Sequence, residues 1–303
     1  MSACRSEQTR RRYGIERVCR VWNVARSTFY GRRGDGNRSA PRVPTKNPSG
    51  WLSETELLAQ IRAQITATSE DDGFLGEGYR KVWARLRARG VRTSKRRVLR
   101  LMRENGLLAP TRKGRPPGPR THDGTIITDA PDVMWGTDAT AIWTRKQGMV
   151  TVFFVVDHCT TELLGVHAAK WANRFEALEP IKQAVRHAYG GYDQDIAKGL
   201  KLRHDHGSQF VSRDYQNQLK FLGIESSPSF VRNPQGNGVA ERYVRTLKEQ
   251  LLWQRDFEDA EDVRVALMQF KTRYNERWIL GRHGYASPQA VRKQLSTAAP
   301  VAA

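Results

Sequence analysis

The sequence predicts a mixed α/β (α+β) domain, built on a five-stranded sheet with flanking helices and preceded by basic all-α units. Two observations support this fold class. Three β-branched and aromatic runs, at 132–144, 149–158 and 163–170, are separated by short turn-like segments, as in an antiparallel meander. Helical and strand patterns alternate after them, which is typical of a mixed sheet covered by helices. The region before these runs shows helical periodicity only.

The charge of the chain is concentrated in its first part. The 303 residues carry a net charge of +20. Residues 1–123 hold 28 Lys and Arg against 11 Asp and Glu, a net charge of +17, whereas residues 124–303 hold 23 against 20, a net charge of +3. No apolar run is long enough to span a membrane and no signal peptide opens the chain. We therefore expect a nucleic-acid partner.

The cysteines exclude two classes of small domain. Cys4, Cys19 and Cys159 are odd in number and form no C-x-x-C pair, which argues against a disulfide framework and a structural zinc site. Cys159 follows a predicted core strand and no activating basic partner is evident, so we interpret it as a packed thiol.

Residues 1–33 predict a helix-turn-helix-like N-terminal segment. Ile15, Val18, Cys19 and Trp22 recur at helical spacing, and Ser27 or Thr28 is suited to cap a second helix that directs Arg32 and Arg33 outward. A basic helical hairpin without groove contacts is the alternative. Residues 34–50 are rich in Gly, Pro, Asn and Ser and predict a linker.

Residues 51–108 predict a second basic helix-turn-helix-like domain. One helix ends at Gly90, and Thr93 or Ser94 caps the next, which directs Val98, Leu99 and Met102 inward. Its arginines are expected to point outward and contact DNA; the alternative is a solvated face. These arginines are Arg96, Arg97, Arg100 and Arg103.

A proline-rich basic linker at 109–124 leads to the mixed domain at 125–292, and residues 293–303 form a tail. After the meander we expect helices at 174–190, 212–223 and 239–254. Short strands are expected at 201–205 and 224–229.

Three acidic residues from separate elements form the candidate site. Asp138 lies in the middle of a predicted strand, Asp205 at the end of the short fourth strand, and Glu241 in the first turn of a helix. An all-oxygen ligand set suits Mg²⁺ or Mn²⁺, and two such ions stabilise the attacking and leaving oxygens of a phosphoryl transfer. We therefore expect a metal-dependent enzyme that acts on the DNA backbone.

Basic and flexible residues surround these acids. Arg245 and Lys248 follow Glu241 by four and seven positions, along one helix face, and are expected to hold a phosphate strand. His204 and His206 flank Asp205; we interpret them as hydrogen-bonded flanking residues rather than ligands. Gly236 and Gly238 predict a loop that orders over DNA.

These motifs resemble one family. The segment "HGSQF" after Asp205, "NPQGNG" before Glu241 and "YNERW…HGYASP" at 274–288 are similar to the DDE transposases and integrases with a ribonuclease-H-like core. Nearly the whole chain resembles the second-frame (OrfB-like) product of two-frame bacterial insertion sequences. The loop departs from the "DNA"-type tripeptide of that group and is closer to the "PQTNG" of integrases.

The resemblance implies that Asp138, Asp205 and Glu241 bind two divalent ions and that Lys248 contacts terminal DNA. It implies strand cleavage at the element end, followed by direct attack of the freed 3′-hydroxyl on target DNA within an oligomeric synaptic complex. It also implies an upstream-frame (OrfA-like) fusion partner and a location in the bacterial cytoplasm, at the nucleoid. One alternative stays open: a DNA-binding regulatory or fusion-dependent subunit without independent catalysis. A ribonuclease-H-type nuclease is a weaker alternative, because the two basic N-terminal units suit groove binding in duplex DNA.

Overall fold

The computed structural model describes residues 7, 10, 13–26, 28, 50–109, 126–229 and 238–298. The chain divides into two compact units, Met1–Trp51 and Leu52–Ala303. Both expected linkers and the loop preceding α9 lie largely outside the described residues. No helix in the described segments is both long and apolar enough to cross a membrane.

The first unit contains the helix α1 (Ile15–Val21), as the periodicity predicts. Cys19 is its buried residue, at 4% exposure. Trp22, expected on the same apolar face, is instead 62% exposed because the helix ends one residue earlier and Trp22 forms its C-cap. Most of the expected second helix, including Arg32 and Arg33, lies outside the described residues.

The second unit begins with three helices, α3 (Glu54–Glu70), α4 (Tyr79–Ala88) and α5 (Lys95–Glu104). A capping box starts α3: the hydroxyl of Ser53 accepts from the Glu56 N–H at 3.2 Å, and the Glu56 carboxylate accepts from the Ser53 N–H at 2.8 Å. The apolar faces of the three helices meet in one buried cluster. Its members are Leu57, Ile61, Val82, Leu86, Val98, Leu101 and Met102.

The α4–α5 turn confirms the expected cap and corrects one expected contact. Ser94 caps α5 by accepting from the Arg97 N–H at 3.2 Å. Arg97, however, does not point outward: it is 9% exposed, and its guanidinium donates to the Leu52 carbonyl at 2.7 Å. A stem long enough to cross the helix surface lets this arginine cover apolar side chains and tie α5 to the start of the unit.

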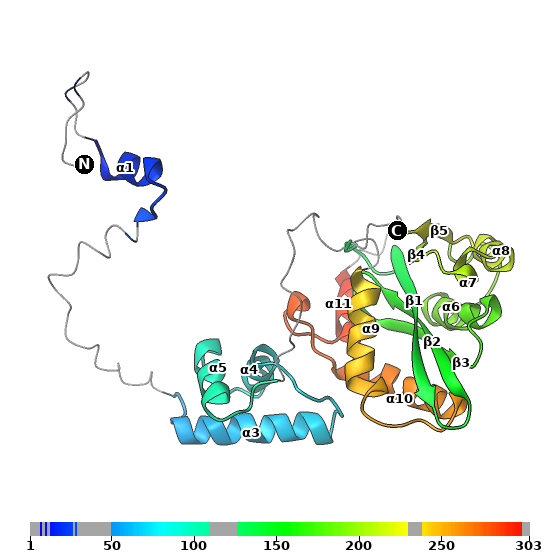
Figure 1. The fold of residues 1–303 in the computed structure, drawn as a ribbon, viewed down its shortest axis with the longest axis horizontal. Helices are drawn as coiled ribbons and strands as arrows, with labels where there is room; N and C mark the ends of the chain where they lie inside the picture. Colours follow the sequence, from blue (N-terminus) through cyan, green and yellow to red (C-terminus); the bar gives the residue numbers. More distant parts are fainter. Residues whose placement is uncertain are drawn as a thin grey trace. The chain divides into compact units, whose positions relative to one another are not determined.

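The remainder of the unit is built on a mixed sheet of five strands (Figure 1). The strands are β1 (Met134–Thr144), β2 (Gly148–Asp157), β3 (Leu163–Ala169), β4 (Lys201–His204) and β5 (Glu225–Pro228). Their order is β3-β2-β1-β4-β5, with β1, β2 and β3 antiparallel and β4 and β5 parallel to β1. The antiparallel β1, β2 and β3 and the mixed directions of the five strands confirm the meander and the mixed five-stranded sheet expected from the sequence.

Helices cover both faces of this sheet. They are α6 (Arg174–Tyr189), α7 (Ser208–Val211), α8 (Arg213–Phe221), α9 (Gly238–Leu247), α10 (Ala260–Arg277) and α11 (Pro288–Ala298). Because successive side chains of a strand point to opposite faces, β2 supplies Phe154 to the cluster beneath α9 and α10, and Phe153 to the cluster beneath α6 and α8. Burial on both faces explains the continuous apolar run of β2.

A glycine sets the distance between α6 and the sheet. A Cβ atom added to Gly165 on β3 would overlap the backbone carbonyl of Pro180 in α6. The side-chain amide of Gln183 then completes this contact: it donates to the Val166 carbonyl at 2.9 Å and accepts from the Val166 N–H at 3.1 Å.

The helix that carries Glu241 is not a regular α-helix throughout. The sequence predicts one helix over 239–254, whereas α9 ends at Leu247 and is followed by a π-helical segment, η2 (Lys248–Leu252). The backbone hydrogen bonds change from the α to the π pattern at Lys248. Short π-helical segments of this kind often lie at functional sites. The middle of η2 also contacts the segment between α3 and α4, since the Gln250 side-chain amide pairs with both backbone groups of Leu75 at 2.8 and 3.0 Å.

The three N-terminal helices of this unit pack on the sheet domain through an aromatic contact that the sequence analysis did not predict. Phe74, which is 1% exposed, lies with its ring centroid 4.9 Å from that of Trp278, just beyond the end of α10. Arg277 reinforces the contact by donating to the Asp71 carbonyl at 2.9 Å and to the Asp72 carboxylate at 3.2 Å.

Candidate active site

The acid on β1 is held in a half-buried position in the middle of the sheet. Asp138 pairs with Phe154 of β2 in the strand register. Its carboxylate accepts from the Ala139 N–H at 2.8 Å. This bond fixes the carboxylate against its own strand.

The second acid follows the neighbouring parallel strand directly. Asp205 is the residue after β4, and its carboxylate accepts from the Gly207 N–H at 2.8 Å. A Cβ atom at Gly207 would lie 2.5 Å from the Gln209 amide nitrogen and 3.0 Å from the Asp205 carboxylate. The turn within "HGSQF" is therefore a tight one that orients the exposed acid.

The histidine before Asp205 has a structural environment. His204 is 1% exposed; one ring nitrogen lies 2.6 Å from the Asp205 carbonyl oxygen and the other 2.9 Å from the Ser226 hydroxyl. With both nitrogens hydrogen-bonded to protein, His204 has the role of a flanking residue, as expected. Burial is the main cause that lowers the pKa of His204, which favours the neutral ring.

The third acid lies on α9, which packs across β1 and β2 (Figure 1). Tyr243 anchors this helix, with its ring centroid 4.7 Å from that of Phe154. Glu241 is exposed in the first turn of α9, and Arg245 is exposed one turn later, where it pairs with Glu249 at 3.3 Å. Gly238, expected in a loop, is the first residue of α9; residues 231–237 lie outside the described part.

Electrostatic interactions connect the three acids and the lysine. The pKa of Asp138 is raised to about 6, chiefly by burial and further by the negative charges of Asp205 and Glu241. The Ala139 N–H and the positive charge of Lys248 act in the opposite direction. The structure thus brings Asp138, Asp205, Glu241 and Lys248 into one electrostatic neighbourhood, although they come from four different segments.

The three acids are close enough to interact electrostatically, but their carboxylates do not converge on one metal position. Within the described residues, no three His, Cys, Asp or Glu side chains come close enough to hold one metal ion together. The donor chemistry nevertheless fits a hard divalent cation, because all three groups offer carboxylate oxygens. A half-buried carboxylate that already carries the repulsion of two others is also the kind of group that a cation would stabilise.

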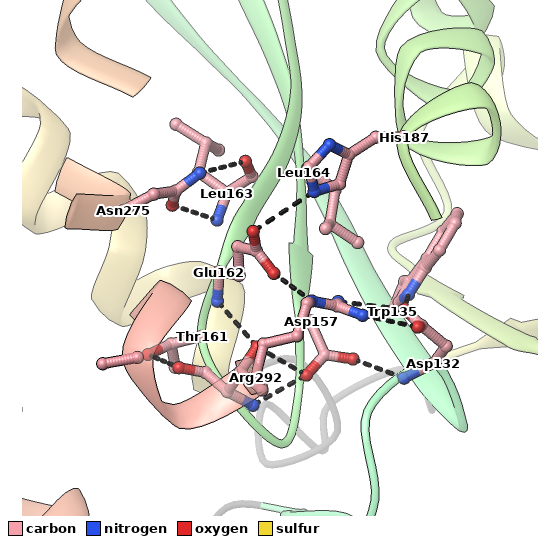
Figure 2. A network of polar contacts seen from close by, with 12 residues as sticks. Asp132, Trp135, Asp157, Thr161, Glu162, Leu163, Leu164, His187, Asn275 and Arg292 are labelled. Atoms are coloured by element: carbon pink, nitrogen blue, oxygen red, sulfur yellow. Dashed lines mark hydrogen bonds and ion pairs between the residues drawn. The ribbon is translucent and has the colours of Figure 1, made fainter. Parts of the chain in front are cut away.

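A buried polar network fixes the start of β1, four residues before Asp138 (Figure 2). Asp132 accepts from the Trp135 indole N–H at 2.9 Å and from two nitrogens of Arg292 at 2.6 and 3.1 Å. Arg292, on α11, also contacts Glu162, and the Asp132 N–H donates to Asp157 at 2.9 Å. This network was not predicted from the sequence, since no local pattern links Asp132 to an arginine 160 positions away.

The expected DNA-contacting arginines of α5 differ in their surroundings. Arg96 is exposed. Arg100 is exposed as well, but its guanidinium pairs with Glu54 and, at 3.1 Å, with Glu104. Arg97 is buried, as described above. Of the three, Arg96 therefore presents the most accessible charge.

Comparisons with known proteins agree with this architecture. A model described as an HTH-like domain matches residues 53–115, and two models described as an integrase core domain match residues 128–234 and 222–295. The transposase for insertion sequence element IS629 of Shigella sonnei is 25% identical over 297 residues, which cover 95% of this chain and 94% of the relative.

Two further similarities concern an Escherichia coli protein and a viral structure. The transposase InsD for insertion element IS2A/D/F/H/I/K of Escherichia coli is 27% identical over 294 residues, which cover 94% of this chain and 92% of the relative. Among solved structures, the catalytic core domain of BIV integrase matches with a TM-score of 0.41 at 23% identity, over 55% of this chain and 97% of that one.

Proposed function

Because the chain belongs to the insertion-sequence transposases with an integrase core domain, we propose that it cleaves and joins DNA strands through an Asp138–Asp205–Glu241 triad. One observation carries the choice of these acids. Asp138 is half-buried and its pKa is raised to about 6 by burial together with the charges of Asp205 and Glu241. Shared electrostatics among carboxylates from separate elements is a recurrent property of catalytic sites.

The triad would hold the divalent metal that integrase-core proteins normally use. When bound, two such ions supply charge stabilisation to the attacking and leaving oxygens of a phosphoryl transfer. Asp138 and Asp205 are positioned by neighbouring parallel strands, and Glu241 by the helix that crosses them. The three carboxylates must approach one another further to share an ion, which mutual repulsion opposes until a cation is present.

The chemistry proceeds in two balanced steps. In the first, a water oxygen gives up a proton and bonds to the phosphorus at the element end. The bond between that phosphorus and the O3′ atom of the element's terminal nucleotide, in the same strand, breaks, and O3′ takes up a proton to become a free 3′-hydroxyl. In the second, this hydroxyl gives up its proton as its oxygen bonds to a target phosphorus, and the O3′ atom of the target strand leaves that phosphorus and takes up a proton. Lys248 and Arg245 are suited to hold the phosphate strand, because Lys248 shares the electrostatic neighbourhood of Asp138 and Arg245 lies one turn after Glu241.

We further propose that Arg96 and Arg100 contact DNA on α5, together with Arg32 and Arg33 beyond the described residues. Arg100 would exchange its exposed carboxylate partners for phosphate, an exchange that costs little because exposed ion pairs are weak. Synapsis of two element ends calls for more than one copy of the chain. We propose an upstream-frame (OrfA-like) product as a partner for end recognition.

The deciding experiment tests cleavage and joining directly. Purified protein is incubated with a labelled DNA end from the inverted repeat that flanks the gene, with Mg²⁺ and with a target plasmid. Asp205→Asn removes one acid of the triad, and Asp214→Asn, on the exposed surface of α8, makes the same change elsewhere. We expect wild-type protein and Asp214→Asn to cut and join, and Asp205→Asn to bind the end without reacting.

The same experiment distinguishes the regulatory alternative. If none of the three proteins reacts while all bind the end equally, the chain is a DNA-binding subunit that depends on a fusion partner or regulates transposition. If Asp205→Asn retains activity, the assignment of the triad is wrong.

A further inference from the structure

A cavity of about 190 Å³ lies on a second face of α9, beside η3 (Gly281–His283) and the end of α10. From α9, Val239, Arg242, Tyr243 and Thr246 line it at helical spacing. The opposite wall contains Thr161, Tyr274, Trp278, Leu280, Gly281 and Arg282. At this volume the cavity is smaller than a site for a whole nucleotide or drug-sized molecule, which typically measures ~300–1,000 Å³.

Two arginines line this cavity, Arg242 on α9 and Arg282 on η3. In the described segments, neither Arg242 nor Arg282 forms an ion pair with an Asp or Glu, and residues 230–237, which precede α9, contain no acidic residue. Burial is the main cause that lowers the pKa of Arg282; repulsion from Arg242 lowers it further, whereas the negative charge of Asp157 acts in the opposite direction. Two like charges held together favour the binding of an anion between them.

The Arg282 guanidinium is held in place by the backbone. It donates to the His158 carbonyl at 3.1 Å and to the Cys159 carbonyl at 2.6 Å. Its Nε atom lies 2.9 Å from a ring nitrogen of His283. The acceptors of these bonds are two backbone carbonyls and a histidine ring, none of which is a carboxylate. Arg282 is therefore a cation fixed in position before a ligand binds.

A buried hydroxyl provides a second, independent indication of a ligand. Tyr243 is 3% exposed, lines the cavity, and its hydroxyl has no hydrogen-bond partner among the described residues. A buried hydroxyl without a partner is costly, so such groups commonly have a water or ligand acceptor. The neighbouring Tyr274 differs, because its hydroxyl is hydrogen-bonded to Thr161.

The aromatic wall favours a phosphate over a nucleobase. One side of Trp278 is occupied by Lys81, whose ammonium lies 3.0 Å from the ring centroid, and its ring also stacks with Tyr274 at a centroid distance of 6.1 Å. A base would need an open aromatic face for stacking. What remains available to a ligand is a pair of guanidinium groups and hydroxyls, which suit phosphate oxygens.

We propose that this cavity is a phosphate-binding site for a DNA backbone phosphodiester, separate from the face of α9 that carries Glu241 and Lys248. Arg242 directly follows Glu241 on α9. A DNA strand bound in the cavity would therefore be held on the face of α9 next to the one that carries Glu241. The inference that the ligand is a phosphate depends only on the cavity. The inference that DNA supplies this phosphate rests on the proposed function. Inorganic phosphate is the other source of the same chemistry.

The test measures binding without catalysis, so it is independent of strand transfer. Fluorescence anisotropy records the affinity of the full chain for a labelled duplex in EDTA over a series of salt concentrations. Each phosphate contact contributes about 0.9 to the slope of log affinity against log salt. We expect Arg242→Gln and Arg282→Gln each to reduce the magnitude of this slope by about 1. Arg186→Gln, an exposed arginine on α6, makes the same charge change away from the cavity and is expected to keep the slope.

Tyr243→Phe tests the buried hydroxyl with almost no change of volume. We expect it to weaken duplex binding several-fold while the melting temperature stays the same or rises, because an unpaired buried hydroxyl is removed. This variant and Arg242→Gln keep the test decisive if Arg282→Gln fails to fold through loss of its backbone contacts.

A thermal-shift arm with inorganic phosphate identifies the source. Two results together support the proposal. Phosphate stabilises the wild-type protein but not Arg242→Gln or Tyr243→Phe, and the DNA salt slope of the variants is reduced. The same phosphate effect with unchanged salt slopes overturns DNA as the ligand and leaves a free-anion site. Unchanged slopes and no phosphate effect overturn the proposal altogether, even if strand transfer is active.

Discussion

The ammonium nitrogen of Lys81 lies 3.0 Å from the centroid of the Trp278 ring, and this contact joins α4 to the end of α10. Lys81 is almost fully enclosed: its side chain is 20% exposed, and Glu77, 3.8 Å away, is 3% exposed. Burial lowers the pKa of Lys81 to about 7, against the opposing effect of Glu77. The indole face also favours the charged ammonium, so a single lysine connects protonation to the packing of the helical segment on the core.

The first prediction concerns the pH dependence of this contact. Between about pH 7 and 10.5 the folded protein holds fewer protons at Lys81 than the unfolded chain, so the free energy of unfolding rises with pH. In Lys81→Met this contribution is absent. The stability of the variant relative to wild type should therefore decrease by about 1.4 kcal/mol for each pH unit from pH 7.5 to 9.

Urea denaturation at several pH values measures this difference. Glu77 retains Arg85 as a partner at 2.8 Å in the variant, so its carboxylate stays paired. Lys95→Met, an exposed lysine 4.4 Å from the Trp83 ring centroid, is the matched control and is expected to leave the wild-type pH dependence in place. A Lys81→Met protein with the same pH profile as wild type would contradict the prediction.

The second prediction separates stability from function at Asp138. Its pKa of about 6 lies above the ordinary 3.8, so the folded state holds more protons between these values and loses stability as pH rises through that window. At pH 7.5 the full cost is present, up to about 3 kcal/mol. Asp138→Asn keeps the acceptor for the Ala139 N–H and should be more stable than wild type at pH 7.5 without metal, a gain that vanishes near pH 4.

Metal addition provides the second readout for this variant. Mg²⁺ should raise the melting temperature of wild-type protein and of Asp214→Asn, but not that of Asp138→Asn, which is also expected to be inactive. If Asp138→Asn is destabilised at neutral pH or retains the Mg²⁺ effect, Asp138 does not belong to a metal-binding triad.

The elements that surround these residues differ in how far the sequence predicts them. The strands and helices of the core follow from local periodicity, and the positions of Asp138, Asp205 and Glu241 on their elements were predicted for that reason. The outward direction predicted for Arg97 was wrong, because a long side chain with an apolar stem is buried when a distant carbonyl, that of Leu52, accepts its charge-assisted bond.

Long-range complementarity accounts for the features that the sequence analysis did not predict. Phe74 and Trp278 are ordinary apolar residues in their own segments, and only the folded chain brings their rings together. The π-segment that starts at Lys248 is equally invisible to a 3.6-residue pattern, since a single wider turn shifts the register without changing composition. Spacing thus predicts which element carries a residue, but not which distant partner fixes it.

The third prediction concerns Arg292, which neutralises two acids at the start of β1 (Figure 2). Glu162 is 2% exposed and Asp132 is half-buried. Removal of the guanidinium leaves Asp132 without its cation and leaves Glu162 with His187 alone, at 3.2 Å. Arg292→Met should lower the free energy of unfolding by about 3–5 kcal/mol at pH 7.5, as is typical when one partner of a buried ion pair is lost.

Chemical denaturation checks this value, and Lys293→Met, an exposed neighbour on α11, should change stability by less than about 0.5 kcal/mol. The deficit of Arg292→Met should shrink at lower pH, where Glu162 is protonated and its charge is removed. A deficit that is independent of pH would mean that Arg292 acts through packing alone.

The fourth prediction concerns Gly165, where the backbone of α6 leaves no room for a side chain. The obstructing atoms are the carbonyl group and Cα of Pro180, so a methyl group at position 165 must push the helix away from β3 rather than turn a flexible side chain aside. Overpacking against side chains costs about 1–3 kcal/mol, and backbone obstruction places Gly165→Ala at or above the upper end of that range. Gly78→Ala is the matched control: Gly78 has φ of −69° and an added Cβ meets nothing within 4 Å. Equal melting temperatures for the two variants would show that α6 moves freely on the sheet and that its distance is not set by Gly165.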